Sequence, residues 1–177
     1  AAADCLRDAA LDAPARENMG LVLTTGMGAH AVNFGFVDGL LEFGMDQGSP
    51  THFSHSVHNA ATSYIATMAG AHGPTLTLTH FSSPLHQGLD AAALLLAGGA
   101  CDHVLLGAVD ELGDLLLAIY AGRGLFAGTV ETPGRIVPGE GAAFFLLTRA
   151  DASERRLGQL AWSEPTDPPA DLVLPDD

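Results

Sequence analysis

Four short apolar runs, separated by helical patterns, constrain the fold more than any other feature of the sequence. The runs are MGLVLTTG (residues 19–26), PTLTLTHF (74–81), HVLLGAVDEL (103–112) and GAAFFLLTRA (141–150). Each has the length of a strand, and the second alternates Thr with Leu at a period of two. Helical patterns at 34–45, 57–70 and 85–99 separate the first three runs, the last pattern closed by Gly98 and Gly99. This interleaving predicts an α/β domain with a largely buried mixed sheet and helices on both faces.

Prolines suggest where other segments end. Residues 1–13 are rich in Ala and Leu and predict the tail of a helix that stops at Pro14. The pair Ser49-Pro50 predicts a loop, with the following helix beginning near His58. Residues 1–152 are expected to form one half domain, and residues 153–177, rich in Pro and Asp, a polar tail or connector.

Charge and hydropathy exclude several classes of partner. The chain has 177 residues, 47% of them hydrophobic, which suffices for one core. Its 21 acidic residues outnumber seven basic ones, all Arg, so the net charge is -14. Nucleic acid and anionic membranes attract basic surfaces and are therefore not expected partners. No apolar run reaches the roughly 18 uninterrupted residues of a membrane span, and we expect a soluble protein.

The two cysteines bear on cellular location. Cys5 and Cys101 are far apart in the sequence, and both lie in segments that look buried. This pattern favours free thiols in a reducing cytoplasm over a disulfide framework. We accordingly expect a cytoplasmic protein.

Three histidines at a spacing of three, His52, His55 and His58, suggest two alternatives. Neutral imidazoles on one helical face can bind zinc. However, no Cys, Asp or Glu lies within the cluster to complete the ligand set. Polar loop or core histidines are the favoured interpretation, and we expect no metal.

Two glycine-containing segments resemble phosphate-binding turns only superficially. The segment GEG, Gly139-Glu140-Gly141, lacks the Gly-x4-Gly-Lys pattern of a phosphate loop. The segment GMGAH lacks the third glycine of a dinucleotide fingerprint. We expect no cofactor, and predict that the two glycines permit a tight turn in which Glu140 satisfies backbone donors.

Several segments together resemble the N-terminal half of a β-ketoacyl synthase, of the thiolase-like superfamily. The longest segment is SPTHFSHSVHNAATSYIATMAGAHGPTLTLT (residues 49–79). It is similar to the family's loop and small-residue helix, which are followed by Gly-Pro and the strand that leads to the catalytic cysteine. Asn59 matches an Asn that opens this helix. Three other segments resemble segments of the family and occur in the same order along the chain: LVLTTGMGA, GLDAAALLLAGGACDHVLLGAVDEL and VPGEGAAFFLL. The resemblance covers about residues 1–150 and is nearest to the divergent chain-length-factor group.

The resemblance also identifies a departure. The family spacing, eight residues on from Pro74, places Ser82 where active members have cysteine. Ser83 is the alternative if the register slips. Either serine could be a nucleophile with His80 or His86 as the base, or could have a structural, helix-capping role.

The resemblance implies a function in fatty acid or polyketide assembly as a non-condensing, chain-length-factor-like partner. A Ser-dependent acyltransferase acting on thioesters and a non-catalytic dimerisation or scaffold module are the alternatives. In the family, the strand matching Thr75–Phe81 pairs with its copy across a two-fold axis. A homodimer, or a heterodimer with an active ketosynthase, is therefore expected. Acyl carrier protein is acidic, so it would dock through the partner.

Overall fold

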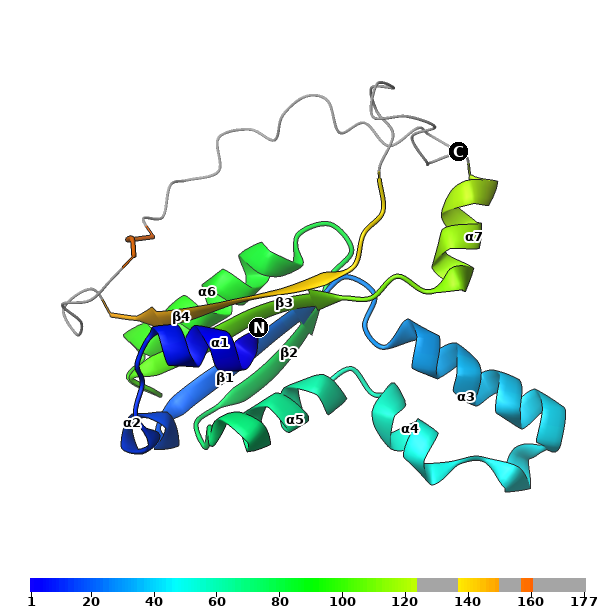
Figure 1. Ribbon diagram of the computed structural model, residues 1–177, viewed down its shortest axis with the longest axis horizontal. Helices are drawn as coiled ribbons and strands as arrows, with labels where there is room; N and C mark the ends of the chain where they lie inside the picture. Colours follow the sequence, from blue (N-terminus) through cyan, green and yellow to red (C-terminus); the bar gives the residue numbers. More distant parts are fainter. Residues whose placement is uncertain (124–136, 150–156, 161–177) are drawn as a thin grey trace.

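The computed structural model describes residues 1–123, 137–149 and 157–160, and within them the chain forms one mixed sheet (Figure 1). Its four strands lie in the order β2-β1-β3-β4. β1 runs parallel to both β2 and β3, and β4 is antiparallel to β3. The four predicted strands are confirmed: β1 (Met19–Thr25), β2 (Thr75–Thr79), β3 (His103–Asp110) and β4 (Gly141–Thr148).

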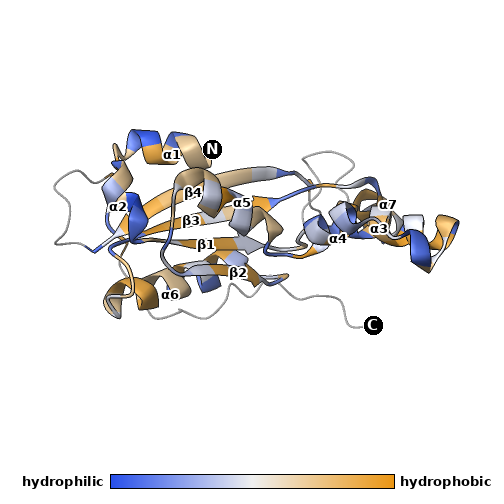
Figure 2. Cartoon of the chain, turned by 90° about the horizontal axis from the view of Figure 1, so that it is seen from below, coloured by the Kyte–Doolittle hydropathy of each residue, from blue (hydrophilic) through white to orange (hydrophobic). Residues whose placement is uncertain are grey.

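Helices cover both faces of this sheet, as predicted. α1 and α5 lie on one face and α6 on the other, whereas α3 and α4 extend away from the sheet (Figures 1 and 2). No helix in the described ranges is long and apolar enough to cross a membrane. The helices are α1 (Ala2–Asp8), α2 (Ala13–Glu17), α3 (His30–Phe43), the 3-10 turn η1 (Met45–Gln47), α4 (Pro50–Ser56), α5 (Ala60–Ala69), α6 (Pro84–Ala97) and α7 (Asp114–Gly122).

The two faces of the sheet bury two separate hydrophobic clusters. Successive side chains of a strand point to opposite faces. Met19 and Leu21 therefore pack with residues of α1 and α5, while Val22 packs against α6. Full burial of an aliphatic side chain stabilises the fold by about 1.5 to 3 kcal/mol. Every residue of β1 is buried, which explains the apolar run of its first five residues.

The outer strands are less buried than the prediction of a largely buried sheet implies. β2 alternates Thr and Leu: Thr77 faces α5, where its hydroxyl contacts that of Thr62, and Leu78 faces the α6 cluster. Three of its five residues are nevertheless exposed, and Thr77 and Leu78 are only partly buried. β4 is similarly exposed over its first three residues. Among the described residues both are outer strands of the sheet, so each pairs with one strand only.

Two proline interpretations are wrong for the same physical reason. Pro14 lies in the first turn of α2, where the Asp12 carboxylate accepts a hydrogen bond from Ala15 N. Pro50 likewise opens α4, whose cap is Ser49. Proline suits the first turn of a helix because its missing N–H would lack an intrahelical acceptor there in any case. The segment predicted as a loop is therefore helical, and the first helix ends at Asp8 rather than at Pro14.

Other boundaries differ by a few residues. α3 begins at His30, four residues before the predicted start, and α5 begins at Ala60 rather than at residue 57. The predicted stop of α6 at Gly98 and Gly99 is confirmed. The predicted domain boundary at residue 152 and most of the tail at 153–177 lie outside the described residues.

Close packing fixes α6 against the sheet. A Cβ at Gly88 would lie 2.4 Å from Thr24 Cγ2 and 2.9 Å from Leu106 Cδ1. Only glycine therefore lets the helix approach β1 and β3 this closely. The N-terminus of α6 is thereby held near the carboxyl end of β1.

Candidate functional site

The carboxyl ends of β1 and β2 form the candidate site. After β1 the chain leads by way of α3 and α4 to α5 on one face, whereas after β2 it enters α6 on the opposite face (Figure 2). Adjacent parallel strands whose connections diverge in this way open a crevice between them, the usual ligand position of α/β sheets. A cavity of about 480 Å³ lies there, lined by Gly26, Met27, His58, Thr79, His80, Phe81 and Ser82.

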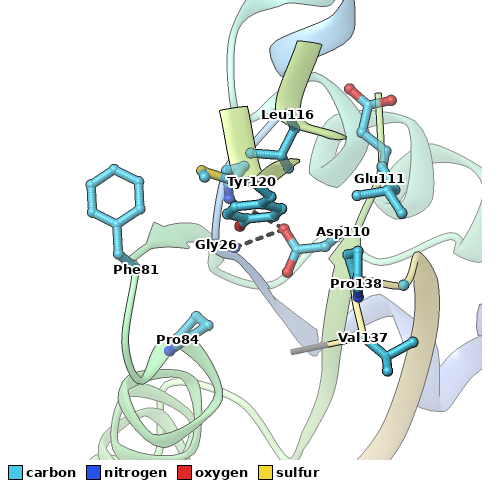
Figure 3. A pocket seen from close by; sticks show the side chains of 12 residues that line it. Gly26, Phe81, Pro84, Asp110, Glu111, Leu116, Tyr120, Val137 and Pro138 are labelled. Atoms are coloured by element: carbon cyan, nitrogen blue, oxygen red, sulfur yellow. Dashed lines mark hydrogen bonds between the residues drawn. The ribbon is translucent and has the colours of Figure 1, made fainter. Parts of the chain in front are cut away.

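A second cavity, of about 260 Å³, continues this crevice toward β3 (Figure 3). It shares Gly26, Met27 and Phe81 with the first cavity. Asp110 and Tyr120 line its other side. The crevice thus crosses the carboxyl ends of all three parallel strands.

Asp110 fixes the loop that separates the two cavities. Its Oδ1 atom accepts hydrogen bonds from Thr25 Oγ1 (2.7 Å), Gly26 N (2.8 Å) and Met27 N (3.2 Å). Because this oxygen accepts three bonds within the protein, the carboxylate has a positioning role. Asp110 is not among the predicted site residues; its signal in the sequence is an acidic residue at the carboxyl end of a buried strand.

Two further carboxylates hold neighbouring loops. Glu111 Oε1 accepts a 3.0 Å hydrogen bond from Ala31 N at the start of α3. Glu140 Oε2 accepts a 3.2 Å bond from Leu112 N. The donor of the latter bond belongs to the loop after β3, 28 positions earlier in the sequence, and not to the local GEG turn.

The glycines of the GEG segment do not have the role predicted for them. Neither Gly139 nor Gly141 has a positive φ angle, and a Cβ at either would have nothing within 4 Å. The turn therefore does not require glycine at these positions.

Ser82 and Ser83 lie in the short turn between β2 and α6, beside His80. His80 Nδ1 accepts hydrogen bonds from Ser82 N (3.3 Å) and Ser83 N (3.2 Å) and lies 3.2 Å from Ser82 Oγ. Ser83 occupies the N-cap position of α6, but its side chain caps no amide. Side-chain capping by Ser83 is thus not seen, and the His80 imidazole accepts from the amides of Ser82 and Ser83, which precede the helix.

Asn59, matched above to an Asn that opens the small-residue helix, does not cap that helix with its side chain. It precedes α5 at the N-cap position. Its backbone carbonyl accepts hydrogen bonds from both the N and the Oγ of Ser63. The backbone of Asn59, rather than its side chain, supports the helix start.

The three histidines of the triplet have separate surroundings. His52 lies near the start of α4, and His55 Nε2 lies 2.7 Å from Tyr64 Oη. The His58 ring packs against Gly28, whose φ angle is +65°. Within the described ranges, no group of three or more His, Cys, Asp or Glu side chains is arranged to hold a metal ion.

Neither cysteine replaces a nucleophile at the turn. Cys101 is fully buried in the α6 cluster, and Cys5 packs against the opposite cluster; both are free thiols. Burial raises the pKa of both thiols above its ordinary value, with a smaller contribution from the Asp8 carboxylate at Cys5 and from the Asp102 carboxylate at Cys101. A raised pKa disfavours the reactive thiolate.

These features define an α/β protein with a mixed sheet and a serine at the turn between a strand and a helix. The chain belongs to the β-ketoacyl synthase family, because residues 6–123 match the model of the β-ketoacyl synthase N-terminal domain. No curated protein sequence matches the chain significantly.

Solved structures share the fold at low sequence identity. One, described as the ishigamide ketosynthase/chain length factor, is 22% identical with a TM-score of 0.63 over 78% of this chain. The ketosynthase ApeO with its chain length factor ApeC from Xenorhabdus doucetiae is 21% identical, with a TM-score of 0.59 over 84%. A type II polyketide ketosynthase complexed with acyl-carrier protein, AntDE:AntF, is 16% identical, with a TM-score of 0.72 over 86%. This chain covers 38%, 53% and 42% of these chains, respectively.

Proposed function

We propose that this chain is a non-condensing, chain-length-factor-like partner of a ketosynthase in fatty acid or polyketide assembly. The observation that carries the proposal is Ser82, which stands at the strand-to-helix turn where the family resemblance places a catalytic cysteine. Cys5 and Cys101 are held in the two hydrophobic clusters, away from this turn. The described residues therefore offer no thiolate to carry an acyl chain through condensation.

The free edge of β2 is the proposed surface for the partner. Pro74 O accepts a hydrogen bond from Leu21 N, and His80 N donates to Thr25 O. In a parallel ladder these bonds come from alternate residues, so the intervening Thr75, Thr77 and Thr79 direct their backbone N–H and C=O groups to the open edge. An unpaired edge of this kind is a template for a strand of another chain.

Apolar side chains are also exposed on the helices that cover the two faces of the sheet (Figure 2). Met68 of α5 is 85% exposed and Leu94 of α6 is 74% exposed. Exposed apolar side chains beside an open strand indicate an interface when they lie close together.

Charge favours a different partner chain over a second copy. Two copies would bring two net charges of -14 together, and like charges oppose association. A ketosynthase with a basic surface would also provide a docking site for an acidic carrier protein, for which a chain with a net charge of -14 is poorly suited. The heterodimer is therefore the form in which we expect the chain to act.

Substitutions at Thr77 test this proposal. T77P removes an outward N–H at the centre of the edge, while T77V removes the same hydroxyl and keeps the N–H. We expect analytical ultracentrifugation to detect a 1:1 complex with a cysteine-containing ketosynthase for the wild type and T77V, and its loss for T77P. Absence of any complex would contradict the proposal, and self-association alone would favour the scaffold alternative.

A further inference from the structure

We propose that Ser82 accepts an acyl group from acyl thioesters, with His80 as its general base. The two residues come from one turn, and both line the larger cavity of the crevice. The proposal does not rest on the partner role, because all its groups belong to this chain. Ser82 would then carry an acyl group on a protein that does not catalyse the condensation reaction.

The contacts of His80 indicate its tautomer. Two backbone amides, those of Ser82 and Ser83, donate to Nδ1, so this nitrogen carries a lone pair and the proton of the neutral ring is on Nε2. Ser82 Oγ, at 3.2 Å from the same nitrogen, acts as the donor in their contact and shares this single lone pair with the two amides. The hydroxyl is thus placed to give its proton to His80 as Ser82 attacks.

The proposed reaction needs only Ser82, His80 and the acyl thioester. Ser82 Oγ attacks the thioester carbonyl carbon, and its proton passes to His80 Nδ1. As the tetrahedral intermediate collapses, the C–S bond breaks and the imidazolium returns the proton to the leaving thiolate. The products are an oxygen ester on Ser82 and a free thiol.

The amides beside His80 can stabilise the intermediate. When Nδ1 receives the proton, the Ser82 and Ser83 N–H groups lose their acceptor. At the same moment negative charge develops on the former carbonyl oxygen, which can accept hydrogen bonds from these groups. Ser83 caps no amide of α6 with its side chain, so the N–H groups in the first turn of that helix are additional donors.

The stability of the product agrees with a non-condensing role. An oxygen ester is a poorer acyl donor than a thioester, because oxygen donates electrons to the carbonyl more effectively than sulfur. Transfer to Ser82 is therefore favourable, while transfer onward to a carbanion is not. Met27 and Phe81 supply apolar lining for the acyl chain in the same cavity.

Intact-mass measurement of the full chain with a short acyl-N-acetylcysteamine thioester tests the proposal. We expect one acyl group on the wild type, mapped to Ser82 and stable to neutral hydroxylamine, which cleaves thioesters. S83A should label like the wild type, and S82A should not label. H80N keeps an acceptor for the amides but is not a base, and should slow labelling by about 10²- to 10⁴-fold.

Ser82→Cys keeps the experiment decisive if Ser82→Ala folds poorly. Its adduct should form at the same position and become sensitive to hydroxylamine, since it is a thioester. Absence of an adduct on the folded wild type, or an adduct that persists in S82A, would overturn the proposal. Unchanged labelling of H80N would overturn the role of His80. None of these results depends on complex formation with a ketosynthase.

Discussion

Thr25 Oγ1 donates a 2.7 Å hydrogen bond to Asp110 Oδ1 and so joins the carboxyl ends of β1 and β3, 85 positions apart in the sequence. The same oxygen accepts hydrogen bonds from the backbone amides of Gly26 and Met27. One carboxylate thus orients the loop that contributes to both cavities of the crevice. The geometry of the site therefore depends on a residue that need not contact any ligand.

Two substitutions of Asp110 distinguish the contribution of its hydrogen-bond acceptor from that of its negative charge. D110A leaves three donors without their acceptor, and we expect a loss of about 2 to 4 kcal/mol in the free energy of unfolding. D110N retains an oxygen acceptor and should cost about 1 kcal/mol. Urea denaturation of the full chain measures both values. Equal losses for the two variants would contradict the hydrogen-bonding role.

Gly28 tests the packing of His58 against the loop after β1. Ala at a φ angle of +65° costs about 1 to 2 kcal/mol in backbone strain. Its Cβ would also overlap the His58 ring, which adds about 1 to 3 kcal/mol. Urea denaturation of G28A should therefore give a larger loss than that of G70A, because Gly70 has a φ angle of +67° but nothing within 4 Å.

The double variant Gly28→Ala with His58→Ala should recover only the steric part of the loss. The remaining difference from His58→Ala should then equal the loss measured for Gly70→Ala. A double variant as unstable as the sum of its single variants would show that His58 does not oppose the added methyl group.

Gly88 tests the close approach of α6 to β1. The methyl group added by the variant Gly88→Ala would meet Thr24 Cγ2, so we expect a loss of about 1 to 3 kcal/mol by urea denaturation. Thr24→Ser removes the Cγ2 methyl group and keeps the hydroxyl that donates to Gly107 O. It should therefore partly rescue Gly88→Ala.

Gly35 provides the matched control on another helix. It lies within α3 and a Cβ there would have nothing within 4 Å. Gly35→Ala should stabilise the protein by about 0.5 to 1 kcal/mol, since Ala loses less backbone entropy in a helix. If Gly88→Ala also stabilised the protein, the proposed packing constraint would be incorrect.

The parts of the fold predicted from the sequence are those with strong local signals. The apolar run of β1 and the glycine stop of α6 are examples, because burial on both faces and a helix end each leave a pattern within a few residues. The start of α4 was missed although Ser49-Pro50 also carries a local signal, that of a capped helix N-terminus. Proline alone does not distinguish a helix start from a loop.

The site was predicted only in part, because its geometry depends on distant contacts. Ser82 was identified by its position relative to Pro74, but its distance from His80 depends on the conformation of the turn. The bond from Thr25 to Asp110 joins segments brought together only by strand pairing. The packing of His58 on Gly28 likewise has no signal in the local sequence.

The buried thiols predict a dependence of stability on pH. Burial raises the pKa of Cys5 and Cys101 in the folded state, so the folded chain binds their protons more tightly than the unfolded chain. This contribution to stability is complete below the unfolded thiol pKa of about 8.5, and it is lost as the pH rises toward the folded pKa. The urea midpoint should therefore fall above about pH 8.5, and this fall should be smaller in Cys101→Ala.

Alkylation by iodoacetamide should be slower than for a free cysteine, and slowest at Cys101, which is fully buried. Rapid alkylation of Cys101 in the folded chain would contradict its burial and reopen the question of which side chain carries acyl groups.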